Sequence, residues 1–382
     1  MHPIPKKGAF FFDIMRCEKI IKIIEDWAPK PIAWERDNVG LQVGSLQRNV
    51  SNILLCLDVT NKVVDEAIKN KCNLIISHHP LLFKPAKKID IDKDRISKIV
   101  EQLIKKDITL YSAHTNLDFT TGGVSFQLAN KLKLKNQKFL FNLSSNQSKI
   151  SVFVPVEFAD KVAEAMHASG AGIIGEYTNC SFRAVGTGTF KGSEKSNSKY
   201  GRKGKLETVE EVKIEVLVNS FDVNKVVAAI KQTHPYEEVA YDVYPLSNSN
   251  VNYGMGVIGE LESEKSPKQF LNYISKHLRI KNFRFTNGKK SKLKKVAVCG
   301  GSGSDLLESA IKSGADAFIT ADIKYHTFQD AENQIILIDA GHYETEIHVL
   351  EELMLRIKNS INNKIKVYKY SGSTNPIIFF NN

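Results

Sequence analysis

The sequence of 382 residues lacks several features that would place it in a specialised class of protein. It has no apolar run long enough to span a bilayer, and its first residues lack the hydrophobic region and small-residue cleavage site of a signal peptide. It also has no evident short-period repeat or low-complexity tract. We therefore expect a cytoplasmic globular protein, in which residues 1–14 form a loose arm or an upstream start.

Cysteine is scarce, because only five are present, an odd number, and none has the spacing of a metal or redox motif. This pattern indicates free thiols in a reducing compartment. The cysteines are Cys17, Cys56, Cys72, Cys180 and Cys299.

The formal net charge of +11 predicts attraction to anions, including nucleotides. Much of this charge lies in two lysine-rich segments, 191–205 and 289–295, which have no interleaved aromatic residues for stacking on bases. We therefore interpret these segments as solvated loops and regard nucleic-acid binding as the weaker alternative.

The chain is long enough for two or three domains. Short apolar runs alternate with polar corners and amphipathic helices in both outer parts, 15–147 and 253–382, which is typical of an α/β sheet with parallel strands. We expect these two parts to fold together as one two-part α/β core domain. The predicted strands are 52–58, 73–77, 108–112, 295–299, 317–321 and 334–340.

The middle of the chain, 148–252, follows a different order, with two β-α-β units separated by a loop rich in lysine, glycine and serine. This order predicts an inserted ferredoxin-like α+β domain.

Polar side chains with metal-binding chemistry follow the predicted strands of the core. Ligands gather at the carboxyl ends of parallel strands, so these corners are expected to meet on one side of the sheet. His342 and Glu346, four residues apart, lie on one face of the first helical turn after a strand and can share a divalent cation. The candidates are His78, His79, His114, Asp118, His342 and Glu346.

Each candidate also has a simpler interpretation. His114 can be an outer partner of a ligand instead of a ligand, Asp118 can cap the following helix, and Glu346 can complement its helix dipole. Their joint occurrence favours a metal site, with adjacent His78 and His79 suiting two ions. Histidine and carboxylate donors without thiolates favour Zn, Mn or Fe over calcium.

Three nearby features remain open at this stage. The glycine-rich turn 300–303 can present amides to a phosphate or be a simple tight turn. Asp322 and His326 can supply acid or base, or hydrogen-bond to the metal ligands. The run 234–238 (HPYEE) is interpreted as an interface or fold-fixing turn.

Several of these segments together resemble the signatures of the GTP cyclohydrolase I type 2 homologue family, also called the NIF-three-like family. The four segments that carry the resemblance are SHHPLLFKP (77–85), SAHTNLDFTTGG (112–123), ADIKYH (321–326) and IDAGHYETE (338–346). The turn RDNVGLQVG (36–44) and the segment HPYEEVAYDVYPL (234–246), similar to the insert of longer members, extend it over the chain from about residue 15.

The resemblance implies a site for two divalent metal ions, a PII-like or CutA-like middle domain and a ring-shaped homohexamer. Its motifs assign the ligand positions to His78, His79, Asp118, His342 and Glu346, with Glu346 as the bridge.

We expect a metal-dependent hydrolase acting on a nucleotide-like or phosphorylated small molecule, with His114 or His326 carrying protons. Opening of a purine ring by a GTP cyclohydrolase is one special case. The alternatives are a metal carrier or regulatory metal-binding protein, and nucleic-acid binding through the lysine loops. The sequence alone does not choose the metal, the substrate or the reaction.

Overall fold

The computed structural model describes residues 15–380 apart from 145, 176, 197–201 and 362–363, so the arm expected at residues 1–14 lies outside the described residues. The chain forms two compact units. The core unit joins the N-terminal part, up to Phe141, to the C-terminal part, from Tyr253 onward, and the insert unit is Asn142–Asn252. The insert thus begins a few residues before the predicted boundary at 148, within the long strand β5 (Lys135–Ser144).

The first sheet of the core has five strands in the order β1-β4-β3-β2-β15. The four strands from β4 to β15 are parallel, and β1 pairs with β4 in the antiparallel sense. The last strand of the chain therefore lies beside one of the first. The strands are β1 (Gly40–Val43), β2 (Asn52–Cys56), β3 (Leu74–Ser77), β4 (Thr109–Ser112) and β15 (Lys366–Lys369).

The second sheet has six strands in the order β11-β14-β13-β12-β10-β5. Its centre, β12 to β14, is parallel, whereas β10 and β11 run antiparallel to their neighbours β12 and β14. The remaining strands are β10 (Ser249–Lys265), β11 (Arg284–Phe285), β12 (Leu293–Val298), β13 (Ala317–Thr320) and β14 (Ile336–Asp339). The prediction of a mixed α/β fold is confirmed, but the strands of the core divide between two sheets that the sequence pattern did not separate.

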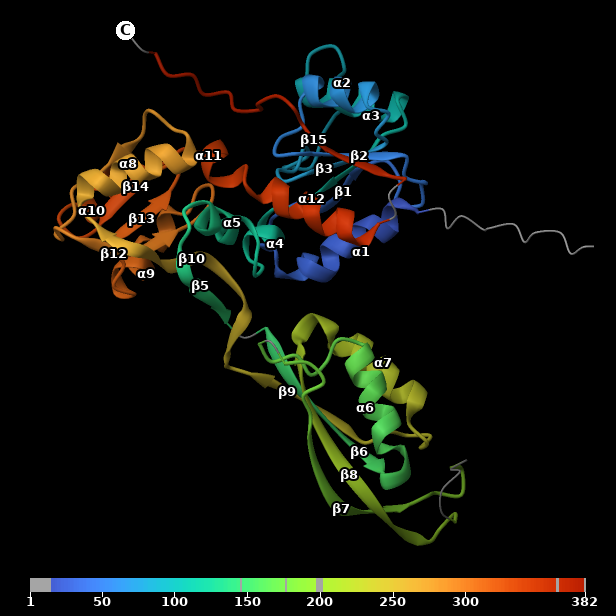
Figure 1. The fold of residues 1–382 in the computed structure, drawn as a ribbon. Coiled ribbons are helices and arrows are strands. Elements are labelled where there is room, and N and C mark those ends of the chain that lie inside the picture. The colour runs from blue at the N-terminus through green and yellow to red at the C-terminus, as the bar shows by residue number, and fades with distance from the viewer. Residues whose placement is uncertain (1–14, 145, 176, 197–201, 362–363, 381–382) are drawn as a thin grey trace, which may run out of the picture. The chain divides into compact units, whose positions relative to one another are not determined.

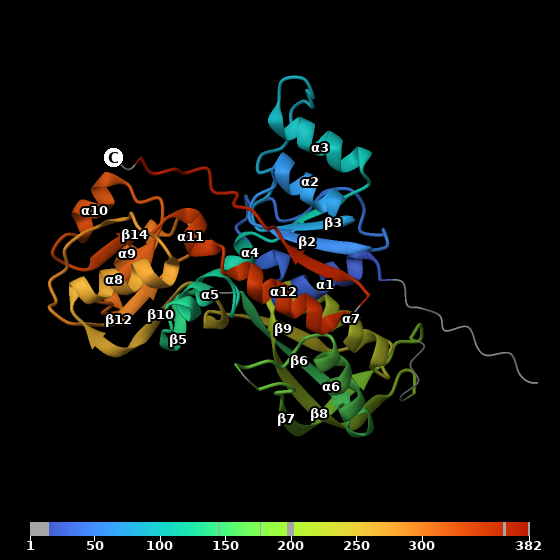
Figure 2. The ribbon, with the colours of Figure 1, turned by 45° about the horizontal axis from the view of Figure 1, so that its top comes forward.

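Helices cover both faces of each core sheet, which explains why their central strands are apolar throughout. In the first sheet, α1 and α12 pack on one face and α2 and α3 on the other. In the second, α5 and α8 pack on one face and α9 and α10 on the other. Figures 1 and 2 show α1 and α12, from opposite ends of the chain, lying side by side. The helices are α1 (Cys17–Trp27), α2 (Asn61–Lys69), α3 (Arg95–Lys105), α4 (Thr115–Asp118), α5 (Val124–Lys131), α8 (Pro267–Leu278), α9 (Leu307–Lys312), α10 (Tyr325–Ala331) and α12 (Val349–Ser360), with single 3-10 turns at η1 (Lys30–Ile32) and η4 (Ser304–Leu306).

The helix predicted after the strand 334–340 is divided in two. A short helix α11 (His342–Glu346) precedes α12, and backbone hydrogen bonds to the third residue, such as Leu350 N to Ile347 O, tighten the chain between them. The buried apolar residues of α12, among them Leu350, Leu353 and Ile357, pack into the core.

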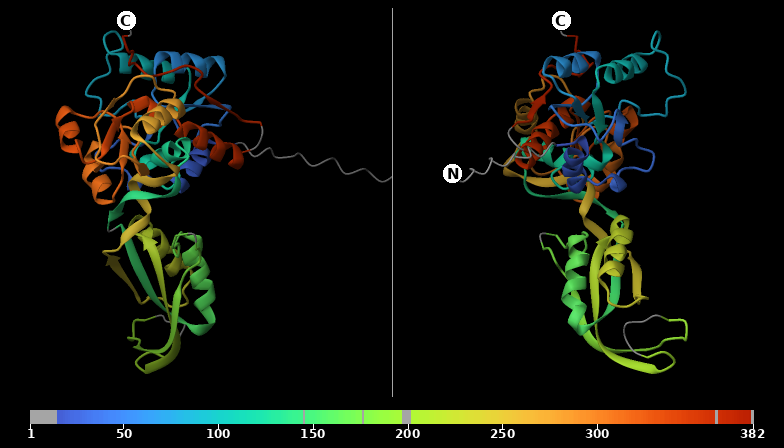
Figure 3. Two further views of the ribbon diagram at one scale, coloured as in Figure 1. Left: turned by 60° about the vertical axis from the view of Figure 1, so that its left-hand side comes forward. Right: turned by 90° about the vertical axis from the view of Figure 1, so that its right-hand side faces the viewer.

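The insert unit has the order β-α-β-β-α-β and one antiparallel sheet, β7-β8-β6-β9, as in ferredoxin-like folds. Its two helices cover one face of that sheet, as Figure 3 shows for the green and yellow-green helices. The elements are β6 (Gln147–Pro155), η2 (Val156–Phe158), α6 (Ala159–Ala168), β7 (Phe182–Lys191), β8 (Leu206–Asn219), η3 (Ser220–Asp222), α7 (Val223–Thr233) and β9 (Tyr241–Leu246).

Two expectations from composition concern the chain as a whole. All five cysteines have free thiols. Among the residues that the structure describes, none of the helices combines the length and the apolar character needed to cross a membrane.

Candidate metal centre

Two adjacent histidines emerge from the end of strand β3. The backbone amides of His78 and His79 donate to the carbonyls of Cys56 (3.1 Å) and Leu57 (2.9 Å), so the ladder with β2 continues past the strand. Pro80 then ends it, because proline has no amide hydrogen to donate. Both imidazoles are held at the carboxyl edge of the first sheet.

The second contribution comes from α11, which follows the carboxyl end of β14 in the second sheet. His342 Nε2 lies 3.1 Å from Glu346 Oε1, so the two side chains share one face of the helix as the sequence predicted. His79 Nε2 lies 3.1 Å from Glu346 Oε2 and 3.2 Å from His342 Nε2. Residues from both sheets thus meet at the carboxylate of Glu346, which is buried.

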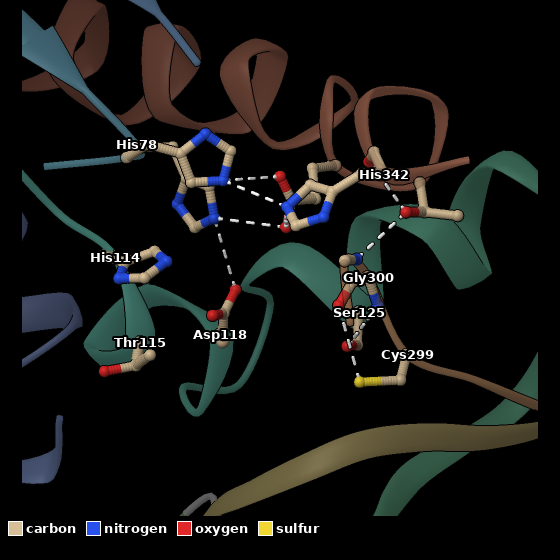
Figure 4. Close-up of polar contacts among 12 residues, drawn as sticks. His78, His114, Thr115, Asp118, Ser125, Cys299, Gly300 and His342 are labelled. Atoms are coloured by element: carbon tan, nitrogen blue, oxygen red, sulfur yellow. Dashed lines mark hydrogen bonds and ion pairs between the residues drawn. The ribbon is translucent and has the colours of Figure 1, made fainter. Parts of the chain in front are cut away.

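The third contribution is Asp118, the last residue of α4. Its Oδ1 lies 3.6 Å from His78 Nε2, and Figure 4 shows His78, His114 and His342 facing the space above it. Within the described part of the chain, His78 Nε2 and Asp118 Oδ1 are both buried and have no hydrogen-bond partner. Unpaired buried polar atoms are costly, so this arrangement fits a cation that would bind both.

The opposite ring nitrogen of each of the four histidines is already engaged. Because Nδ1 faces an oxygen acceptor in every case, each ring can present Nε2 to the centre as a ligand lone pair. The pairs are His78 with Ala113 O (2.9 Å), His79 with Asp58 Oδ1 (2.8 Å), His342 with Asp322 Oδ2 (2.6 Å) and His114 with both carboxylate oxygens of Asp37 (2.9 Å each).

These donors form two overlapping clusters among the described residues, and His79 belongs to both. One contains His78, His79 and His114, and the other His79, His342 and Glu346. Neither cluster contains a cysteine, and burial raises the pKa of the neighbouring Cys299 thiol to about 12. Imidazole and carboxylate donors suit a first-row divalent ion, and the residues present therefore fit a metal site.

The glycine-rich turn 300–303 does not offer its amides to a phosphate. The amides of Gly300, Gly301 and Gly303 donate to hydroxyl oxygens of Ser125 (3.2 Å), Thr345 (3.0 Å) and Thr320 (2.9 Å). The turn instead makes room for the metal ligands, because a Cβ atom on Gly301 would lie 2.2 Å from Glu346 Oε1. These hydrogen bonds favour the alternative of a simple tight turn over that of a phosphate cradle.

The charged groups of the centre shift one another's pKa values. Burial by itself would lower the pKa of His79, but hydrogen bonds to Asp58 and Glu346 raise it to about 10. Burial would also lower the pKa of His342, but hydrogen bonds to Glu346 and Asp322 raise it to about 9. Burial would raise the pKa of Glu346, yet the charge of His78 and a hydrogen bond from His342 hold it well below its usual value.

These shifts predict that metal binding depends steeply on pH. Because the raised pKa values keep His79 and His342 protonated at pH 7, a metal ion must displace their protons. Affinity for Mn²⁺ should rise between pH 6 and 8 by about tenfold per pH unit for each proton displaced. Calorimetry in buffers of different ionisation enthalpy counts the released protons. A pH-independent affinity without proton release would contradict this prediction.

The two residues expected to carry protons lie in different surroundings. His114 belongs to a cluster and is held by Asp37, whose carboxylate is buried and also accepts from Thr115. His326 is exposed on α10, where its Nδ1 lies 3.0 Å from Gln329 Oε1. The proton-carrying role stays a prediction for both, and the geometry favours His114.

Sequence reasoning missed Asp37 and Asp58 as partners of the histidines. Asp58 lies two residues after the end of strand β2 at Cys56, so the rule that picked out the other strand ends could have found it. Asp37 lies in an irregular turn and gives no such signal.

In the insert, His234 donates to Phe153 O (2.9 Å) and accepts from Tyr236 N (3.1 Å), which agrees with the interpretation of residues 234–238 as a fold-fixing turn.

A fold of two α/β sheets that meet at a His/carboxylate centre matches known proteins along nearly the whole chain. Residues 15–376 match the family model described as Duf34/NIF3 (NGG1p interacting factor 3), and the chain belongs to this family. The resemblance seen in the sequence motifs is thereby confirmed.

Several relatives cover almost the full length of the chain. A protein of Halalkalibacterium halodurans called GTP cyclohydrolase 1 type 2 homolog is 39% identical over 372 residues, which cover 95% of this chain and 98% of that protein. A Bacillus subtilis protein of the same name is 36% identical over 367 residues, with 95% and 98% covered. The crystal structure of a Bacillus cereus protein related to NIF3 matches with a TM-score of 0.84 and 39% identity, covering 96% of this chain and all of that one.

Proposed function

We propose that the protein is a binuclear metal-dependent hydrolase that acts on a small anionic substrate, either nucleotide-like or phosphorylated. The observation that carries the proposal is the buried carboxylate of Glu346, which faces His79 and His342 at 3.1 Å each and His78 at 3.7 Å. A carboxylate in this position can bridge two ions, as in two-metal hydrolytic sites.

The roles of the residues follow from their positions. His78 and Asp118 would hold one ion and His342 the other, and His79 and Glu346 lie close enough to both groups to serve either ion. Asp37 fixes the ring of His114, so that Nε2 can accept a proton from a reacting group and return it. When bound, the ions supply Lewis acidity for hydrolysis. The donor set favours Zn, Mn or Fe.

Two further observations support an anionic substrate. The net charge of +11 attracts anions in general. Since the glycine-rich turn uses its amides internally, the anionic group is best placed at the metal centre itself. The name GTP cyclohydrolase 1 type 2 homolog of the relatives makes purine-ring opening one reaction to include in a screen.

The test begins with metal analysis of freshly purified protein, followed by a screen of nucleotides and phosphoesters with the native ion. We expect turnover that is lost in His79→Ala without loss of fold, and kept in His167→Ala, a matched deletion of a histidine that lies in the insert unit and outside the two clusters. Metal transfer to an apo-acceptor without any turnover would instead favour a metal carrier. Binding of nucleic acid that falls steeply with salt and persists in His79→Ala would favour the lysine-rich loops.

The ring-shaped homohexamer implied by the family resemblance remains part of the proposal. Light scattering of the full chain measures its mass in solution, and a monomeric mass would contradict a hexamer.

A further inference from the structure

The C-terminal segment 371–380 follows β15 and runs without regular structure toward α11, as Figures 1 and 2 show for the red end of the ribbon. Two side chains attach it to the core. Thr374 Oγ1 donates to Asp58 Oδ2 at 2.7 Å, and Asn375 Nδ2 donates to Glu344 Oε1 at 2.8 Å. The segment therefore connects the first sheet to the helix that carries His342.

Both attachment points lie beside the candidate metal centre. Asp58 is the acceptor for the Nδ1 atom of His79, and Glu344 lies on α11 between His342 and Glu346. The hydroxyl of Thr374 thus occupies the second oxygen of a carboxylate whose first oxygen orients a candidate ligand. Beyond Asn375 the chain is held next to the site.

Apolar side chains of the segment alternate in exposure. Ile378 and Phe380 are 92% and 90% exposed, whereas Ile377 and Phe379 are 55% and 53% exposed. This period of two is that of an extended chain with one face toward the protein. The inner residues still have about half of their surface uncovered, which indicates that they line a cavity instead of packing into a core.

Ile377 and Phe379 line a cavity of about 220 Å³ together with His342 and Phe283. Carboxylates also line it, but each has a partner within the protein: Asp322 binds His342 Nδ1, Asp339 pairs with Arg284, and Glu344 binds Asn375. Asn375 is neutral and leaves the charge of Glu344 in place, so the carboxylates are engaged within the protein while Ile280, Phe283, Ile377 and Phe379 supply the apolar part of the lining. At roughly 30 Å³ for a water molecule, the volume suits a single ring.

The geometry points to a substrate subsite, formed in part by the C-terminal segment, that takes the planar ring of a small substrate whose anionic group lies at the metal centre. The inference deepens the proposed function and rests on it. Phe379 and Ile377 contact the ring from the side of the segment, and Phe283 contacts it from the second sheet. Ring substrates are thereby favoured over equally charged ligands without a ring.

Phenylphosphonate and methylphosphonate test this inference, because they share the anionic group and differ in the ring. Calorimetry on the full chain loaded with Mn²⁺ should give about tenfold tighter binding of phenylphosphonate. The double variant Ile377→Ala/Phe379→Ala should reduce this preference to less than about twofold while its affinity for Mn²⁺ alone stays within twofold. The matched control Ile378→Ala/Phe380→Ala, which deletes the same groups from the outer face, should keep the preference.

The outcomes separate the subsite from the metal centre. Wild-type protein that binds Mn²⁺ but treats the two phosphonates alike overturns the subsite and leaves the metal centre standing. A preference that survives Ile377→Ala/Phe379→Ala, or that is lost equally in the outer-face control, also overturns it. Failure of the wild-type protein to bind Mn²⁺ overturns the proposed function and the subsite together.

Discussion

Replacing Glu346 with glutamine is expected to lower the affinity for Mn²⁺ or Zn²⁺ at least a hundredfold. The carboxylate is buried, lies 3.1 Å from the Nε2 atoms of both His79 and His342, and supplies the negative charge in the middle of the cluster. Glutamine has the same shape but no charge, and its amide nitrogen cannot bind a metal ion as a carboxylate oxygen does. An affinity loss larger than that of an outer partner, typically 10–100-fold, follows.

Titration calorimetry on metal-free protein measures this effect, and circular dichroism checks that the variant is folded. Glu308→Gln is the matched control, because Glu308 pairs only with exposed Lys312 in the contacts of the described chain and should keep full affinity. Wild-type affinity in Glu346→Gln would show that the centre does not depend on this carboxylate, and the binuclear proposal would fall.

Replacing Gly301 with alanine should both destabilise the protein and disrupt the centre. Gly301 has a φ of +63°, and an added Cβ would lie 2.2 Å from Glu346 Oε1 and 3.3 Å from His342 Nε2. The backbone cannot retreat easily, since Gly301 N donates to Thr345 and Gly301 O accepts from Thr320. The left-handed conformation costs about 1–2 kcal/mol for alanine and overpacking a further ~1–3 kcal/mol.

Gly175→Ala separates the two causes. Gly175 has a similar φ of +56°, but no atom lies within 4 Å of its added Cβ. Urea unfolding should therefore give a loss of about 1–2 kcal/mol for Gly175→Ala and about 2–5 kcal/mol for Gly301→Ala, and only the latter should lose metal binding. Equal losses in the two variants, with metal affinity unchanged, would contradict the close approach to Glu346.

The sequence predicted the elements of the site better than their surroundings. His78, His79 and Asp118 follow strands of the first sheet, and His342 and Glu346 follow a strand of the second. The rule that the ends of parallel strands share one edge of a sheet therefore predicted each group, but not that the two groups meet from two sheets. This rule depends only on local apolar patterns, and the structure brings these five side chains together. Whether they bind metal is a separate question, which the experiments above address.

Long-range pairing was beyond the sequence pattern. Strand β15 pairs with β2 across more than three hundred residues, and nothing in either short apolar run specifies the other as its neighbour. The division of the core into two sheets was missed for this reason. Asp37 is linked to His114 across 77 positions, and an isolated aspartate in a turn gives no sign of such a partner.

The sequence left the role of the glycine-rich turn open for a related reason. Its position between a strand and a helix is the same as in phosphate-binding loops, so the pattern alone cannot tell the two apart. Three hydroxyl groups from distant parts of the chain decide the outcome by occupying its amides.

The pairing of β15 with β2 and the packing of α12 against α1 have a consequence for biosynthesis. A nascent chain emerging from the ribosome exposes an open β2 edge and the apolar face of α1 until α12 and β15, about three hundred residues further on, have been made. Because His342 and Glu346 also lie far downstream of His78 and His79, the growing polypeptide cannot assemble the centre before α11 has been made. Premature termination anywhere before α11 would leave a product without it.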